Sequence, residues 1–428
     1  MKTRIIIAIL LVGMSTLYSQ NYLDVIKPFQ GMSGRSGAES GITPAAMVES
    51  NALLGNPALL SYSEKTTLSA DLSFNQVEGT SVFNSTIWDK SSDYGLSFNS
   101  LTYIHPVRVY RGAWVWGFNL QPVSSFSSIN EFGDLEPDEG FDYQYRAIET
   151  GNLYALTGGS SVLVTMNTSV GFAISYLAGE NSFTRIYEET DTHDYFTFDK
   201  YTDSLHFAPK YNGIGARLGL LTELSENLNL GASLEFPSWI SVSESSSRTV
   251  TEELDTGAEV LIEDSSWPAL DYSVWGPWRL GLGLGFVAEP LEASVNYRFH
   301  SYRTTSMSGD LLDPDNGEYL EDIIAKEIDK NVGNVHEFSA SLHWALDPLQ
   351  LSFAASVMND ALNYQLDNII RLDLGFGYQM SSGLGFTLAL RNEQWQSNLD
   401  HILDSGAERT VGVENNFSKY QFGIKYTL

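Results

Sequence analysis

The chain has 428 residues and a formal net charge of −29, from 24 basic and 53 acidic side chains. An acidic balance of this size argues against a nucleic-acid partner, because phosphate contacts need a basic face. Cysteine is absent, which excludes disulfides, thiolate metal sites, a cysteine nucleophile and an acylated N-terminal cysteine. The length suits either two or three soluble domains or one large barrel. The composition, which is rich in glycine and aromatic residues, is the property that can distinguish these two alternatives.

Residues 1–20 have the three parts of a secretory signal peptide. Lys2 and Arg4 give the positive start, residues 5–12 the apolar run, and residues 15–20 a small and polar exit. The alternative is a membrane anchor, but the apolar run is far shorter than the roughly 20 residues that span a bilayer. The sequence therefore predicts export.

Residues 21–64 lack regular alternation and are predicted to form a compact N-terminal plug, or hatch. Glycine and proline interrupt regular structure throughout this segment, and we expect one short helical turn near residues 45–51. Pro57 fixes its own φ and biases Asn56 away from helix, which favours a fixed bend. A flexible tail is the alternative, but it would leave an apolar cluster in water. That cluster is Leu53, Leu54, Ala58, Leu59 and Leu60.

From residue 65 to 428 apolar residues recur with a period of two, as in the run from Leu68 to Phe74. Short turns, such as Glu289-Pro290 and Asp347-Pro348, alternate with long polar segments. This asymmetry is typical of an outer-membrane barrel, and counting hairpins predicts an all-β, transmembrane antiparallel β-barrel of about 14 strands. Aromatic residues near strand ends suit interfacial girdles, although a soluble sandwich core would also hold aromatics. The segments expected to be long loops are 75–93, 122–142, 180–208, 241–276, 301–334, 358–368 and 392–408.

The run Gly-Asn-Pro-Ala at residues 55–58, after a glycine-rich segment and before a first strand, resembles the hatch of the FadL/TodX long-chain fatty-acid and hydrocarbon transporters. Residues 226–237 and 276–283 are similar to that family's turns and strand starts. The resemblance implies a plug motif of Asn56, Pro57 and Ala58. It also implies a channel in the bacterial cell outer membrane for passive uptake of small hydrophobic molecules, such as long-chain fatty acids or hydrocarbons.

PorV-like relatives share this plan, so a second function stays open: a non-transporting barrel adaptor that binds a partner protein. Besides a hydrophobic small molecule, the expected partners are outer-membrane lipid and, for the adaptor, another protein. Bound lipid in a purified sample would favour transport, and a stoichiometric protein partner would favour the adaptor.

Residues that could carry catalysis or bind metal are sparse. The seven histidines show no HxH or HExxH spacing, and no GxSxG elbow is present, so we expect no enzyme, no metal and no cofactor. The acidic segments 241–276 and 301–334 are interpreted as solvated surface. A cation site is the alternative, because residues 313–317 are faintly similar to a calcium loop.

Aromatic side chains in the polar segments are candidates for capturing an apolar ligand, because such a ligand gains about 25 cal/mol per Å² on leaving water. Packing of the long loops on one another is the alternative role for the same side chains. The tentative capture residues are Phe126, Phe132, Phe141, Phe183, Phe196 and Phe198.

Overall fold

The computed structural model describes residues 25–30, 49–83, 86–136, 141–312, 317–362, 368–402 and 408–428. The signal peptide predicted at residues 1–20 lies outside these ranges and stays a prediction. Residues 313–316 of the calcium-like run 313–317 also lie outside the described ranges, and only Gly317 is described.

Strands make up most of the described chain, and the helices are short. No helix among the described residues is long and apolar enough to cross a membrane. The helices are α2 (Lys27–Gln30), α3 (Glu49–Gly55), η3 (Pro57–Tyr62), η4 (Tyr302–Thr304) and α4 (Leu320–Asn331). The strands are β1 (Thr67–Phe83), β2 (Thr86–Val107), β3 (Trp114–Ser125), β4 (Ser128–Glu136), β5 (Phe141–Thr165), β6 (Thr168–Asp191), β7 (Phe198–Ser225), β8 (Leu228–Glu235), β9 (Trp239–Leu254), β10 (Glu259–Trp275), β11 (Arg279–Ala288), β12 (Leu291–His300), β13 (Ser306–Ser308), β14 (Val335–Leu346), β15 (Leu349–Met358), β16 (Ile369–Gln379), β17 (Leu384–Ile402) and β18 (Glu408–Thr427).

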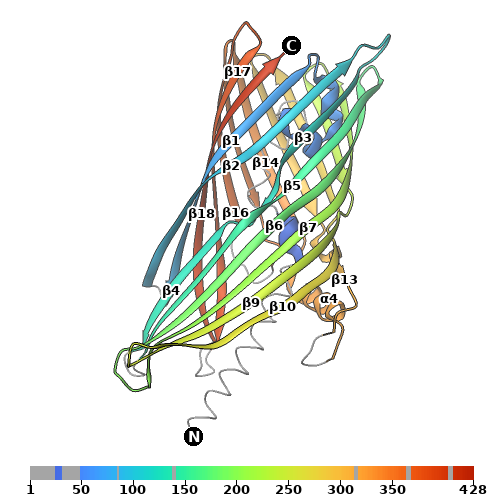
Figure 1. Cartoon of the computed structure of the whole chain (residues 1–428). Coiled ribbons are helices and arrows are strands. Elements are labelled where there is room, and N and C mark those ends of the chain that lie inside the picture. Colours follow the sequence, from blue (N-terminus) through green and yellow to red (C-terminus); the bar gives the residue numbers. More distant parts are fainter. Residues whose placement is uncertain are drawn as a thin grey trace.

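The strands form one antiparallel sheet that closes on itself through pairing of β1 with β18, in register from Thr67 opposite Thr427 to Val82 opposite Gly412. Three positions in the wall are each filled by two consecutive strands. β3 and β4 both pair with β5, and β8 and β9 both pair with β7. β11 pairs with β8 and β10 pairs with β9, so β10 and β11 share the next position, and β13 is only a short addition beside β10. The wall is a closed barrel of 14 strands, as the alternation predicts (Figure 1).

The barrel is apolar outside and polar inside. On β1, Leu72 and Phe74 are exposed, whereas Asp71 and Ser73 are buried on the inner face. The same alternation recurs around the wall and is the reverse of a soluble protein, where large apolar side chains point inward. An outward apolar band with a polar interior is the pattern of a transmembrane barrel.

The short connections are confirmed and gather at one end of the barrel. Two-residue links at Glu289-Pro290 and Asp347-Pro348 join β11 to β12 and β14 to β15. At the other end, residues 301–334 carry η4, β13 and α4 (Figure 1).

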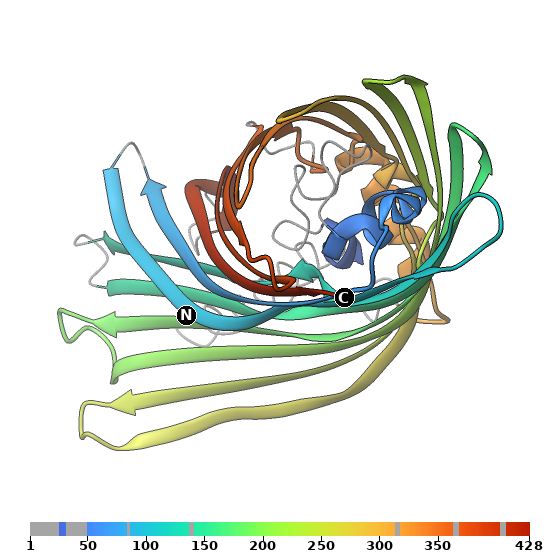
Figure 2. The ribbon, with the colours of Figure 1, turned by 90° about the horizontal axis from the view of Figure 1, so that it is seen from above.

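Most of the segments expected to be long loops are strands instead. Residues 180–208 belong largely to β6 and β7, and residues 241–276 to β9 and β10. β5 has 25 residues, although a membrane crossing needs about 9–11. We call β4, β9, β10 and the outer halves of β5, β6 and β7 the wing, a curved sheet that runs out beyond the barrel rim (Figure 2). Ladder hydrogen bonds continue there while the apolar alternation that marks a lipid-facing strand stops, so polarity alone suggested loops.

The described helices before β1, which are α2, α3 and η3, lie inside the barrel (Figure 2). The expected helical turn at residues 45–51 corresponds to α3, which runs from Glu49 to Gly55. Residues 45–48 are outside the described ranges. The 3₁₀-helix η3 follows directly, because Asn56 caps it and Pro57 occupies its first turn. We call residues 49–62 the lumen segment.

Candidate functional site

The lumen segment is attached to the wall through the motif singled out from the sequence. Asn56 is fully buried; its amide Nδ2 donates to the carbonyl oxygen of Leu220 at 3.0 Å, and its Oδ1 accepts from the Ala58 N–H at 3.1 Å. The carbonyl oxygen of Ala58 accepts from Ser161 Oγ at 3.1 Å. One asparagine thus satisfies the start of η3 and ties it to β7.

Two wall glycines allow this close approach. A Cβ on Gly219 would lie 2.8 Å from the Ala58 backbone nitrogen, and one on Gly171 would lie 2.5 Å from the same atom. Side-chain movement cannot relieve a clash with backbone, so these positions require glycine. Apolar packing completes the attachment. The buried cluster consists of Ala52, Leu53, Ala58, Leu59 and Leu60 of the lumen segment with Ile104, Val115, Ala173 and Leu221 of the wall.

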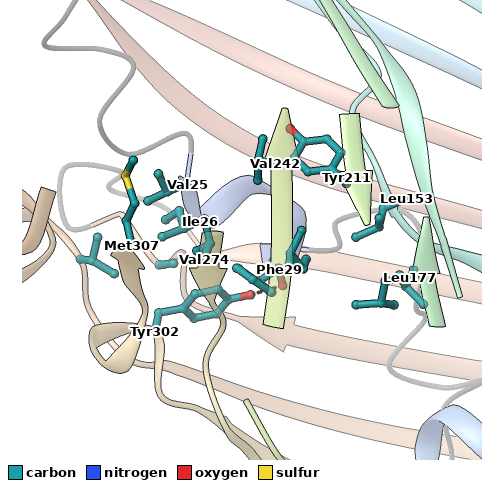
Figure 3. Close-up of a cluster of buried hydrophobic side chains, with 14 of the residues drawn as sticks. Val25, Ile26, Phe29, Leu153, Leu177, Tyr211, Val242, Val274, Tyr302 and Met307 are labelled. Carbon is teal, nitrogen blue, oxygen red and sulfur yellow. Dashed lines mark hydrogen bonds between the residues drawn. The ribbon is translucent and has the colours of Figure 1, made fainter. Parts of the chain in front are cut away.

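At the other end of the lumen, α2 is held chiefly through Phe29. The hydroxyl of Tyr302 donates to the Phe29 carbonyl oxygen at 2.6 Å, and the Arg279 guanidinium donates to the same oxygen. A Cβ on Gly276 would lie 2.6 Å from Cδ1 of the Phe29 ring and closer still to Cε1, so the break between β10 and β11 makes room for the ring. Figure 3 shows Phe29 beside Tyr302, within a cluster that also contains Ile26 and Met307.

A pocket lies between α2, the end of α3 and the inner face of the wall. We call it the lumen pocket. Part of its lining is apolar, and part carries charged groups on β7, β8, β11, β12, β14 and β16. Its apolar residues include Phe29, Leu54, Val123, Leu153, Leu177, Ile240 and Met358. Its ionisable residues are Arg217, Glu235, Arg279, Arg298, His300, Glu337 and Arg371.

The charged groups form ion pairs across neighbouring strands. Glu235 binds two guanidinium groups, from Arg217 and, at 2.9 Å, from Arg279. Arg279 also has a buried Nε with no hydrogen-bond partner in the described part of the chain. Removing either member of such a buried pair would leave an uncompensated charge, which costs several kcal/mol.

A second group of charges surrounds Glu337. This carboxylate lies 3.2 Å from Arg298 Nη1 and 3.5 Å from His300 Nε2. Arg371 also lines the pocket and pairs with Glu393 at 2.9 Å. Four arginines and two glutamates therefore line the pocket, and Glu393 pairs with the fourth arginine, so the polar wall keeps an excess of one positive charge, where Glu235 binds two guanidinium groups. Such an arrangement can hold a molecule with an apolar body and an anionic head.

The predicted capture residues do not converge on this pocket. Phe126 is buried in the lumen and stacks on Tyr211, with ring centroids 5.5 Å apart. Phe183 contacts Phe207 on the wing, and Phe196 stacks on Phe198 at the β6–β7 connection. The side chains of Phe132 and Phe141 lie outside the described part of the structure. Ligand capture by these six phenylalanines stays a prediction.

The ionisable pocket residues were missed by the sequence reasoning. Their only signal is a charged side chain at an inward position of an apolar strand, such as Arg217 between Ala216 and Leu218. Period-two alternation marks these positions as inward, but it does not show that β7, β11, β12 and β16 bring them to one level of the barrel. Among the described residues, no group of His, Asp and Glu is arranged to hold a metal ion.

Comparison with known proteins places the fold. No protein-family model matches the chain, and no curated protein matches it in sequence. The P. putida toluene transporter TodX is similar in structure, with a TM-score of 0.60 at 14% identity, over 89% of this chain and 95% of TodX. A Pseudomonas aeruginosa FadL homologue gives 0.58 at 10% identity, over 94% and 98%. The monoaromatic hydrocarbon channel CymD gives 0.55 at 13% identity, over 94% and 97%.

These likenesses extend over nearly the whole of both chains and confirm, for the fold, the resemblance to FadL and TodX. At 10–14% identity they establish the architecture alone. The similar structures are transport channels rather than enzymes.

Proposed function

We propose that this chain is a channel of the bacterial outer membrane that admits small hydrophobic molecules by passive diffusion. The observation that carries the proposal is the lumen pocket, which lies inside a barrel with an apolar outer band and an N-terminal segment in its interior. The outer band would contact membrane lipid, and the short connections would face the periplasm. No catalysis is proposed.

The charge of the pocket favours an amphipathic anion, such as a fatty acid, over a neutral hydrocarbon. A neutral ligand gains only from apolar burial, about 0.8 kcal/mol per methylene. A carboxylate gains the same burial and also binds an arginine, and a charge-assisted hydrogen bond contributes about 1.5–3 kcal/mol. Toluene, the compound for which TodX is described as a transporter, carries no anionic head group.

The lumen segment would serve as a plug. A barrel of 14 strands is wider than the eight-strand size that side chains alone can fill, so a further element has to close it. The anchored turn at Asn56 and the buried leucines of η3 fit this role.

The ligand class can be tested with two molecules of equal chain length, decanoic acid and 1-decanol. We expect the acid to bind the protein in non-ionic detergent about 10–100-fold more tightly, by titration calorimetry. Arg298→Gln should remove most of this preference, whereas Arg298→Gln with Glu337→Gln, which keeps the pocket charge, should retain more of it. Equal affinities would assign the pocket to neutral molecules, and no binding of either would overturn the channel function.

The orientation can be tested on intact cells. Protease added outside should cut near the β9–β10 connection at residues 255–258, which is exposed. Cleavage confined to the short connections would reverse the proposed orientation and contradict the placement of the wing outside the cell.

A further inference from the structure

The outermost strand of the wing, β10, leaves one of its edges open. β10 pairs with β9 along its length, but on its other side β13 pairs with residues 273–275 only. Within the described part of the chain, residues 259–271 therefore have a partner strand on one side alone. Figure 2 shows β10 at the outer margin of the wing.

The opposite edge of the wing, β4, is covered. Ile129 of β4 is buried against Val77 of β1 and Phe417 of β18. The Ser81 hydroxyl of β1 also donates to the carbonyl oxygen of Glu131 at 2.8 Å. The protein thus protects one edge of the wing with its own strands and exposes the other.

The side chains of β10 are unusually apolar for an exposed edge. Leu261 is 59% exposed, Ile262 53%, Trp267 43% and Leu270 42%. Natural edge strands are usually protected by charges, prolines and bulges, and β10 has Pro268 within one bulge. Protection alone does not explain four large apolar side chains in water, and such a strand is a template for pairing with another chain.

The charge around this edge is strongly negative. Residues 241–276 contain eight acidic residues and one basic residue, Arg248. Arg248 is buried and already binds Asp203 at 2.9 Å, with Glu263 at 3.5 Å. Asp264, next along β10, is exposed. A second copy of this chain would place acid against acid, and an anionic membrane surface would also be repelled.

We infer that the open edge of β10 binds an extended, basic segment of another protein, which adds to the wing as a further strand. Register shifts at Leu261/Glu263 and Trp267/Leu270 leave a regular stretch of residues 263–267 between them. Alternate residues of this stretch direct their backbone groups away from β9 and toward the added strand.

The stretch also specifies the partner's pattern. Glu263 and Trp267 share one face of β10, and Asp264 lies on the other. An antiparallel partner therefore needs a basic residue opposite the exposed Asp264 and an apolar residue opposite Trp267, three positions before that basic residue. A second basic residue, directly after the first, would lie opposite Glu263, which also contacts Arg248. The pattern is apolar, two residues of any kind, then one or two basic residues.

The test uses the full-length protein in nanodiscs and a labelled peptide, Gly-Leu-Thr-Ser-Lys-Lys-Gly, with a control in which both lysines are replaced by glutamate. We expect saturable binding of the lysine peptide by fluorescence anisotropy. Hydrogen exchange should slow at amides within residues 263–267 and not in α4. Asp264→Lys should weaken binding about fivefold, because it replaces an attraction with a repulsion. Asp255→Lys, the same charge change at the exposed β9–β10 connection, should leave binding nearly unchanged.

Several results would overturn the inference. These are equal binding of the glutamate peptide, binding without protection of residues 263–267, and protection of these amides in nanodiscs without peptide, which would assign the edge to lipid. Protection that rises with protein concentration, together with a dimer in sedimentation, would assign the edge to a second copy. None of these results bears on the lumen pocket, so the channel function is tested separately.

Discussion

The two ends of the lumen hold different described parts of the N-terminal chain, η3 and α2, and the two are attached in different ways. At η3, attachment is by buried apolar side chains and by backbone that touches glycines of the wall. At α2, one carbonyl oxygen, that of Phe29, receives both polar contacts, from Tyr302 and Arg279. The first attachment brings backbone against wall glycines, whereas the second combines buried side chains of α2 with two hydrogen bonds beside the lumen pocket. We therefore expect η3 to be the fixed end and α2 to be the more easily released end.

The largest effect is expected from removing the chain that connects α2 to η3. Deleting residues 31–51 removes the chain that precedes the fixed end, including part of α3, and should leave a folded barrel that conducts ions strongly in a planar bilayer. The intact protein should conduct weakly. Equal conductance from the two proteins would rule out a plug.

At the fixed end, Gly219→Ala should displace the lumen segment. The new Cβ would lie 2.8 Å from the Ala58 nitrogen, and overpacking of this kind costs about 1–3 kcal/mol. We expect a lower temperature for the shift between folded and unfolded bands on a gel, together with higher conductance. Gly95→Ala is the matched control, because no atom lies within 4 Å of the Cβ it would add. Similar behaviour of the two variants would contradict the tight fit.

At the releasable end, Tyr302→Phe removes one of the two donors to the Phe29 carbonyl. A hydrogen bond contributes about 0.5–1.5 kcal/mol, so exchange of amides in residues 25–30 should rise about two- to tenfold. Tyr110→Phe, at a fully exposed tyrosine, is the control. Unchanged exchange in Tyr302→Phe would mean that packing of Phe29, rather than its carbonyl, holds α2.

The smallest effect is expected away from both ends. Phe196 stacks on Phe198 with ring centroids 5.6 Å apart and is 43% exposed at the β6–β7 connection. If this pair captures ligand, Phe196→Ala should lower the initial rate of decanoic acid uptake about twofold and leave equilibrium binding unchanged. Val109→Ala, at an exposed residue of a short connection, should change neither. Loss of equilibrium binding in Phe196→Ala would place a second site at the connection.

Much of the barrel could be predicted from the sequence, because a lipid-facing strand must alternate. The alternating runs that contain Leu72 and Phe376, for example, indicate that the segment is a strand and which of its side chains face lipid, and this restricts the register of its pairing. The wing could not, since its strands lack that period: the outer half of β6 is half-buried at nearly every position, and β10 is exposed along most of its length. Asn56 and Pro57 were found because a cap followed by proline has local chemistry that can be read in order.

The lumen pocket could not be predicted for a different reason. Arg217, Arg279 and Arg371 are separated by dozens of residues and meet only because of strand tilt and closure of the barrel. A single inward arginine looks the same in the sequence whether it lines a pocket or only pairs with a neighbouring strand, as Arg391 does with Asp373.

The seam between β1 and β18 has a consequence for how the molecule is assembled. It joins the first and last strands of the chain, whereas the lumen segment binds β5, β6 and β7. Pairings this distant in sequence form slowly, because the entropy of closing the loop has to be overcome first. The lumen segment precedes in sequence every strand that surrounds it, and β18 follows the other strands of the wall. Pairing of β18 with β1 therefore converts an open sheet with a bound N-terminal segment into a closed barrel, so the 20 residues of β18 decide when the interior is shut.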